Sequence, residues 1–260
     1  MADNVVMKNI RLITRADDIG SSKSANAAVV DAVRAGYVKN VSLMANGSFI
    51  DDAAQKLMNN KSACFGLHAT LNAEWDKVKW GPILNLGKES GLIDDDGYFL
   101  STPKMFSETK PCVDTVLSEL DAQLDKLTKL GFFISYVDSH MYAEVFIDGF
   151  NEAKRNWAKS KGLLHHMDYN NSPQDIYAEE NLKNLEGYLC SIPDGQYLHV
   201  THPAYYSDEM LEVGNKDTPG SEVARTRDQE ARIISNPSLV TSLASRGVAV
   251  IRYDEAAIKA

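Results

Sequence analysis

The stretch Ile10-Arg-Leu-Ile-Thr-Arg-Ala-Asp-Asp-Ile-Gly20 decides the fold class of this chain. An apolar, β-branched run ends in two neighbouring carboxylates and a glycine. Ser21-Ser-Lys-Ser24 then supplies residues that typically cap a helix. A strand, a short turn and a helix open a βα unit, in which residues just beyond the carboxyl end of the strand face the ligand. Two acids there repel each other unless a cation shares their charge, so Asp17 and Asp18 predict a divalent metal.

The rest of the chain repeats this alternation of strands and helices. Short apolar runs predict further strands at 40–45, 63–68, 132–140, 163–166, 196–202 and 248–253. Apolar residues at helical spacing predict helices at 25–36, 49–58, 113–130, 148–161, 178–189, 222–235 and 236–247. Such alternation is typical of an α/β protein with a parallel sheet. The length and the number of units favour an irregular, single-domain (β/α) barrel with about seven strands, spanning residues 1–260.

Residues 73–112 break the alternation. Gly, Pro, Asp and Ser are frequent in this stretch, and aromatic residues are spread among them: Trp75, Trp80, Tyr98, Phe99 and Phe106. Loops of this length are uncommon in compact domains, and they usually serve a function or carry small elements of their own. We therefore expect an excursion of the same domain over the strand ends.

Composition and charge exclude some classes of function. The net charge of −9 argues against nucleic acid or an anionic membrane as a partner. Three cysteines without CxxC spacing, Cys64, Cys112 and Cys190, indicate a reducing compartment. The N-terminus shows no signal peptide, and no apolar run approaches the ~18–20 residues of a membrane helix. We expect a cytoplasmic protein without a membrane-spanning segment.

Four predicted strands end on residues of metal-ligand or acid–base type: Asp17 with Asp18, His68, His140 and His202. In a parallel barrel all carboxyl ends lie on one rim, so these residues meet in space. Imidazole with carboxylate suits Zn²⁺ and other first-row metals, and three protein ligands with open positions make a catalytic site. Asp138 precedes His140 by two residues and therefore shares its face of the strand, where it could orient a metal ligand.

Each of these residues also has a structural interpretation. Taken alone, the paired acids fit a solvated turn, and one histidine at a strand end is commonly a hydrogen-bonded core or rim residue. Their convergence favours the metal site. Asp138 could equally be a surface or capping acid, and Trp75 and Trp80 could either stack on a sugar or pack under the loop. Three further histidines are expected to be structural: His165, His166 and His199.

A polar segment, residues 207–220, follows His202, and a charged stretch comes after it. It holds Arg225, Arg227, Asp228 and Glu230. The pattern favours the start of a helix with exposed charges over active-site residues.

At these residues the sequence resembles the YdjC-like carbohydrate deacetylases, the family of chitooligosaccharide deacetylase. The resemblance covers nearly the whole chain and rests on ordered segments: Ala16-Asp-Asp-Ile-Gly20, Phe65-Gly-Leu-His-Ala-Thr-Leu-Asn72, Val137-Asp-Ser-His140, Thr201-His-Pro-Ala-Tyr205 and the region from Arg227 to Glu230. The chain has Ile19, Tyr142 and Ala204 where the family commonly has Phe, His and Gly. The difference at Tyr142 bears on the substrate subsite.

The resemblance implies a (β/α) barrel that removes N-acetyl groups from small sugars, such as chitobiose or its 6-phosphate, with one divalent ion, Mg²⁺ or Zn²⁺. It implies that Asp18, His68 and His140 bind the metal. Asp17 would then be the general base on the metal-bound water, and His202 the general acid for the leaving amine. A homodimer is also implied. Candidates for substrate contact are Trp75, Tyr205 and Arg227.

Two other functions compete with deacetylation. Some family members carry a name that suggests cellobiose-phosphate cleavage, but phosphoglycoside hydrolysis needs two carboxylates about 5–9.5 Å apart. Adjacent acids suit one metal better. A non-catalytic sugar- or metal-binding regulatory protein would show affinity without releasing acetate, and the complete set of base, ligands and acid argues against it.

Overall fold

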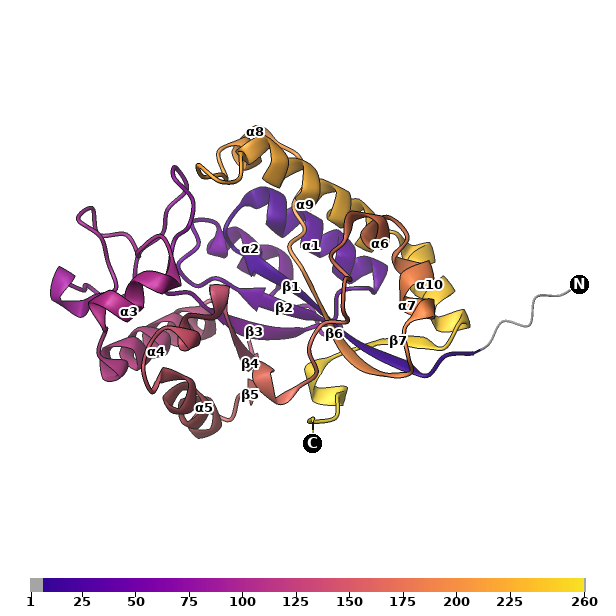
Figure 1. Ribbon diagram of the computed structural model, residues 1–260, viewed down its shortest axis with the longest axis horizontal. Coiled ribbons are helices and arrows are strands. Elements are labelled where there is room, and N and C mark those ends of the chain that lie inside the picture. Colours follow the sequence, from indigo (N-terminus) through magenta and orange to yellow (C-terminus); the bar gives the residue numbers. More distant parts are fainter. Residues whose placement is uncertain (1–6, 260) are drawn as a thin grey trace, which may run out of the picture.

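Seven parallel strands form one curved sheet in the computed structural model, which describes residues 7–259 (Figure 1). The strands are β1 (Ile10–Ile19), β2 (Asn40–Leu43), β3 (Cys64–Ala69), β4 (Ile134–Ser139), β5 (Leu164–His165), β6 (Gly195–Thr201) and β7 (Val248–Ile251). Their hydrogen-bonded order is β5-β4-β3-β2-β1-β6, and β7 pairs with the first half of β1. Among the described residues no pairing joins β5 to β6, so the sheet is a half-barrel. The predicted α/β class with seven strands is confirmed.

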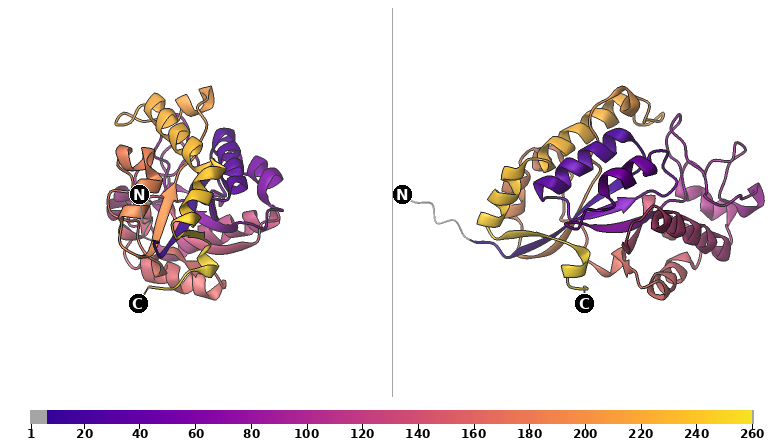
Figure 2. Two further views of the ribbon diagram at one scale, coloured as in Figure 1. Left: turned by 90° about the vertical axis from the view of Figure 1, so that its right-hand side faces the viewer. Right: turned by 180° about the vertical axis from the view of Figure 1, so that it is seen from behind.

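Helices connect most of these strands. They are α1 (Lys23–Ala35), α2 (Ile50–Leu57), α3 (Phe106–Thr109), α4 (Val113–Lys129), α5 (Phe150–Ser160), α6 (Glu179–Lys183), α7 (Leu185–Ser191), α8 (Asp208–Leu211), α9 (Gly220–Ile234) and α10 (Pro237–Ser245). Figure 1, and Figure 2 from behind, show α9 beside α1. Helices α1, α2, α4 and α5 all pack on the outer face of the half-barrel, where their buried residues share one hydrophobic core with the outward side chains of the strands. The single helix predicted at 178–189 is divided into α6 and α7, because Asn184 leaves helical geometry and caps α7.

The first βα unit forms as its sequence predicts. The Ser22 side chain accepts a hydrogen bond from the Ala25 N–H at 2.9 Å and caps α1. Gly36 ends the helix with φ 88°, the left-handed conformation that favours glycine. Between these ends α1 buries a face of small apolar residues, among them Ala28, Val29 and Ala32, against the sheet. Burial of this stripe fixes the helix beside β1 and sets the direction of the turn that carries the two acids.

Inward-facing side chains change character along the strands. Because alternate residues share a face, Ile13, Tyr136 and Leu198 form one apolar layer inside the half-barrel with Tyr253. This layer is closely packed, since a Cβ on Gly66 would lie 2.2 Å from the Tyr136 ring. Two residues further along β1, β3 and β4 the inward positions are ionisable: Arg15, His68 and Asp138. The half-barrel is therefore a packed core at the amino ends of the strands and a polar pocket at their carboxyl ends.

The segment between β3 and α4 forms no regular sheet. It carries short helical turns at Lys88–Ser90 and Pro103–Met105, the helix α3, and an antiparallel bridge between Ile93 and Phe99. Three of its aromatic residues are buried: Trp80, Phe99 and Phe106.

No helix within residues 7–259 combines the length and the apolar character that crossing a membrane requires. Residues 1–6, part of the stretch in which no signal peptide is expected, and residue 260 lie outside the described part of the chain.

Candidate metal centre

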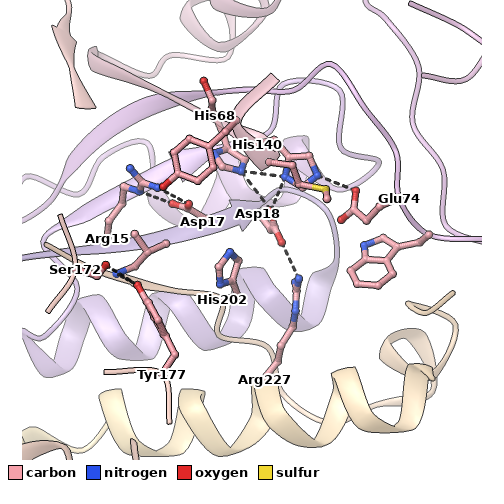
Figure 3. Close-up of a pocket in the computed structure, with 15 residues that line it drawn as sticks. Arg15, Asp17, Asp18, His68, Glu74, His140, Ser172, Tyr177, His202 and Arg227 are labelled. Atoms are coloured by element: carbon pink, nitrogen blue, oxygen red, sulfur yellow. Dashed lines mark hydrogen bonds and ion pairs between the residues drawn. The ribbon is translucent and has the colours of Figure 1, made fainter. Parts of the chain in front are cut away.

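A bulge in β1 brings the two neighbouring acids to the same pocket. On a regular strand Asp17 and Asp18 would face opposite sides of the sheet. The register between β1 and β2 shifts between Ala16 and Ile19, and Asp18 adopts φ 64°. A left-handed residue in a bulge redirects its side chain, and aspartate tolerates this conformation better than most residues do. Both carboxylates therefore line one cavity (Figure 3).

Asp18, His68 and His140 present three ligand atoms to one point. The His68 Nε2 and His140 Nδ1 atoms are 3.3 Å apart, and they lie 3.4 Å and 3.3 Å from Asp18 Oδ1. Tetrahedral ligands about 2.1 Å from a metal are about 3.4 Å from one another. All three side chains are buried, and Asp18 Oδ1 has no hydrogen-bond partner. A buried carboxylate oxygen left without a donor is costly, so this tripod fits a divalent cation.

Carboxylates fix the opposite nitrogen of each histidine. His68 Nδ1 lies 2.6 Å from Asp138 Oδ1, and His140 Nε2 lies 2.8 Å from Glu74 Oε2. Contacts of this kind set the orientation of metal-binding imidazoles. Burial lowers the pKa of both rings, but the charge of Asp138 outweighs it and raises the pKa of His68 to about 9. Glu74 with Asp18 raises the pKa of His140 to about 10. The pocket therefore strongly favours positive charge.

A second group of possible ligands, Asp17, His68 and Asp138, already contains a cation. Arg15 donates from Nε and Nη2 to the two oxygens of Asp17, both at 2.6 Å, and its Nε lies 3.1 Å from Asp138 Oδ2. Burial opposes the charge of Arg15, yet both carboxylates together hold its pKa well above the usual value. Asp18 lacks such a partner at Oδ1, and this difference makes the first group the better candidate for holding a metal.

The charges around the tripod leave room for a divalent ion. Four carboxylates meet two guanidinium groups there: Asp17, Asp18, Asp138 and Glu74 against Arg15 and Arg227. With the histidines neutral, as metal binding requires, two negative charges remain uncompensated.

The opposite wall of the pocket comes from the end of β6 and from α9. His202 follows β6, and its backbone N–H donates to Glu230 at 2.6 Å. Its ring faces the tripod (Figure 3), and burial lowers its pKa, although the charges of Asp18 and Asp17 oppose the shift. Arg227 donates from Nη2 to Asp18 Oδ2 at 2.8 Å and lies 6.0 Å from the Trp75 ring centre.

The interpretation of the charged stretch as an exposed helix start is wrong for two of its residues. Helix α9 begins at Gly220, so Arg227 and Glu230 lie in its middle and line the pocket and a neighbouring cavity, where both are partly buried. Arg225 is exposed, in keeping with the expectation.

The whole pocket has a volume of about 450 Å³, within the range of small-molecule sites. It is lined by Arg15, Asp17, Asp18, His68, Glu74, Trp75, Ser139, His140, Met141, Tyr142, Ser172, Tyr177, Val200, His202 and Arg227. Tyr205 does not line it, because its hydroxyl donates to Asp31 on α1 at 2.7 Å. Trp80 is buried and donates to the Asn72 carbonyl, so of its two interpretations the structure adopts packing under the loop.

Sequence reasoning missed several residues of the site. Glu74 and Arg15 were not proposed as partners of the ligands, and Tyr142 and Tyr177 were not proposed as wall residues. Glu74 lies six residues beyond His68 in the irregular segment, where no periodicity places a side chain. Arg15 had a usable signal, because it precedes Asp17 by two residues on a strand and so shares its face.

The fold and the tripod together define an α/β half-barrel with a candidate metal centre at the carboxyl ends of its strands. The family described as YdjC-like protein matches residues 11–167. The chain belongs to this family, as its motifs predicted.

Relatives of known name are similar over almost their full length. A protein named carbohydrate deacetylase from Thermoanaerobacter pseudethanolicus is 26% identical over 257 residues, which are 93% of this chain and 97% of the relative. Another of that name, from Listeria monocytogenes serotype 4a, is 26% identical over 261 residues, 94% and 99% of the two chains. A crystal structure from Enterococcus faecalis V583, named for cellobiose-phosphate cleavage, has a TM-score of 0.75 at 20% identity and covers 95% of this chain and 98% of its own. That likeness shows the same fold.

Proposed function

We propose that this chain is a metal-dependent carbohydrate deacetylase that hydrolyses the N-acetyl amide of a small amino sugar, such as chitobiose. The observation that carries the proposal is the buried tripod of Asp18, His68 and His140, with Asp18 Oδ1 lacking a donor. The relatives named carbohydrate deacetylase support the substrate class.

The ligand set favours one divalent ion, Zn²⁺ ahead of Mg²⁺, because two imidazoles with one carboxylate suit first-row metals better than an oxygen-seeking ion. A bound ion would polarise the acetyl carbonyl and lower the pKa of water. The protein itself must then hold the substrate and move two protons.

Asp17 is the group that we assign to take the proton from the attacking water. Its carboxylate lies in the pocket beside the tripod, and Arg15 donates hydrogen bonds to both of its oxygens, which fixes its orientation. A general base must be ionised and within reach of the proton it removes. His202 is assigned to protonate the leaving amine as the C–N bond breaks, because its ring faces the tripod from the opposite wall. For this step it must carry the proton as the imidazolium.

The two acids of β1 do not favour phosphoglycoside hydrolysis. A glycosidase pair needs one carboxyl that keeps a proton at neutral pH. Arg227 instead holds the pKa of Asp18 well below its usual range, although burial opposes this. Asp17 is paired with Arg15. Neither acid has the environment of a proton donor.

An acetate-release assay tests the proposal. Chitobiose and N-acetylglucosamine are incubated with the protein as purified, after chelation, and after Zn²⁺ or Mg²⁺ is restored, and mass spectrometry follows the sugar. We expect loss of one acetyl group with the glycosidic bond intact, and loss of activity on chelation that the metal reverses. Cleavage of the glycosidic bond, or acetate release that chelation leaves unchanged, would contradict the proposal.

A further inference from the structure

The loop between α8 and α9 is bonded to the first residues of the irregular segment that follows β3. Asn215 donates from Nδ2 to the Glu74 carbonyl oxygen at 3.2 Å, and the Asp76 N–H donates to the Gly214 carbonyl oxygen at 2.9 Å. Asn215 and Glu74 are 141 residues apart in the sequence. The contact therefore joins a distant loop to the residue that orients the imidazole of His140.

Glu74 depends on such outside contacts for its position. It lies in no helix or strand, so no regular backbone pairing fixes its main chain. Its carboxylate must nevertheless meet one atom, because Oε2 lies 2.8 Å from His140 Nε2 (Figure 3). Asn72 Nδ2 lies 3.4 Å from the same oxygen, which is long for a hydrogen bond. A bond to the Glu74 backbone therefore limits how far the carboxylate can move away from the imidazole.

Asn215 is itself held in a fixed turn. Its Oδ1 accepts from the N–H groups of Asp217 and Thr218, both at 3.0 Å, which is the arrangement of an Asx turn. The ends of the loop also approach closely, since a Cβ on Gly214 would lie 2.4 Å from the Gly220 nitrogen. The side-chain amide is thus presented from a closed turn and not from a freely moving side chain.

A further contact between the same two segments is an ion pair on the surface. Lys77 Nζ lies 2.6 Å from Glu212 Oε2, and their side chains are 69% and 53% exposed. Exposed ion pairs contribute little to stability, because water screens them and two long side chains must be ordered. The link between the segments therefore depends on the hydrogen bonds of Asn215 and Gly214.

We propose that Asn215 is a positioning residue for His140. Its amide holds the Glu74 backbone, and the Glu74 carboxylate in turn keeps the imidazole in the orientation that a metal requires. Asn215 does not line the metal pocket, so it acts through Glu74. This inference rests on the metal centre of the proposed function and assigns a role to a loop outside that centre.

Metal affinity tests the inference. Asn215→Ser removes the amide donor and keeps an oxygen that can accept from the N–H groups of the turn. In competition with a chelator, the dissociation constant for Zn²⁺ should rise by about 3- to 10-fold, the effect of one lost uncharged hydrogen bond. Asn236→Ser makes the same change where an asparagine caps α10, and its affinity should match the wild type. Equal affinities of the two variants would overturn the proposal.

A double-mutant cycle separates positioning from a general effect on the fold. Glu74→Ala removes the carboxylate through which Asn215 is proposed to act. In that background Asn215→Ser should change the dissociation constant by less than about twofold, because changes along one line of contacts are not additive. The same fold-change in both backgrounds would show that Asn215 only stabilises the loop, and the proposal would be wrong.

A measurement without metal keeps the two proposals distinguishable. The proton on His140 Nε2 exchanges with water only when its bond to Glu74 opens, and NMR measures this rate. Asn215→Ser should speed the exchange by about threefold or more, and Asn236→Ser should not change it. If the wild type binds neither Zn²⁺ nor Mg²⁺, the metal-dependent function fails, and the exchange rate still decides whether Asn215 positions the imidazole. If the wild type binds metal but Asn215→Ser leaves both affinity and exchange unchanged, only the inference about Asn215 fails.

Discussion

The two walls of the pocket differ in how firmly their side chains are held. We call the wall from β1, β3 and β4 the strand wall, and the wall from the end of β6 and from α9 the helix wall. On the strand wall, from β1, β3 and β4, the imidazoles of His68 and His140 and the carboxylate of Asp17 are all buried and each has a fixed ionic or hydrogen-bond partner. On the wall formed by the end of β6 and by α9, His202 is held through its backbone while its ring faces the cavity, and Arg227 is only partly buried.

This difference separates two tasks. Buried, fully partnered groups keep their geometry and so suit a metal and a base, whose positions must be exact to a fraction of an ångström. Groups with a free polar end can meet a ligand instead. We infer that the strand wall carries the chemistry and the helix wall the selection of substrate.

The largest effect should come from the base on the strand wall. Asp17→Asn keeps the shape of the side chain but removes the charge that accepts a proton, and general-base catalysis is worth about 10²- to 10⁴-fold. We expect kcat to fall within that range while the affinity for Zn²⁺ stays within about twofold, because Asp17 is not in the tripod. Stopped assays and metal titration measure the two quantities on one sample.

The control for this variant is Asp228→Asn, which removes the charge of a carboxylate on α9 that pairs with Arg232, accepts from the Tyr206 N–H and does not line the metal pocket. Its activity should match that of the wild type. Activity of Asp17→Asn within threefold of wild type would remove the base assignment, and loss of the metal would place Asp17 among the ligands.

A smaller effect should follow from loosening one ligand of the strand wall. Glu74→Gln keeps a hydrogen-bond acceptor for His140 Nε2 but removes the charge that orients and polarises the ring. Changes to such outer partners typically cost about 10- to 100-fold in metal affinity. Titration with a competing chelator should show this loss for Zn²⁺, and activity should return at saturating metal.

Glu212→Gln provides the comparison, since it removes an exposed carboxylate whose ion pair within residues 7–259 is with Lys77. Metal affinity of Glu74→Gln equal to that of this control would mean that the irregular segment does not support the metal centre.

The two walls also differ in how far their residues could be predicted. His68 and His140 follow from strand periodicity, because the end of a parallel strand has a known location. Asp17 and Asp18 were placed there too, but a regular strand would have pointed them apart. The bulge, with φ 64° at Asp18, turns both side chains into the same pocket, and no pattern in the sequence predicts this bulge.

Long-range partners were beyond prediction for a physical reason. Arg227 reaches Asp18 from a helix 209 residues further along the chain, and Glu74 reaches His140 from a segment without periodicity. Such contacts depend on the position of a helix along its neighbour and on the path that a loop takes. Tertiary packing decides both, and local propensity does not.

The smallest predicted effect concerns the stability of the helix wall. Burial raises the pKa of Glu230 to about 7, although the His202 N–H and Arg227 oppose the rise. The folded state therefore holds this proton more tightly than the unfolded chain does. The resulting stabilisation is complete below the ordinary pKa of glutamate and is lost as the pH rises through about 7.

Glu230→Gln should remove this dependence, since the amide is uncharged throughout. Relative to wild type, the free energy of unfolding of the variant should rise between pH 5 and pH 8 by on the order of 1 to 2 kcal/mol, less than the full shift because the side chain is partly exposed. Denaturant unfolding at fixed saturating Zn²⁺ measures this free energy of unfolding, with Glu222→Gln as a control on the same helix.

Parallel pH profiles for the wild type and Glu230→Gln would show that Glu230 is ionised in the folded protein. The helix wall would then carry a fixed negative charge beside His202, and Glu230 would disfavour an anionic substrate at every pH tested.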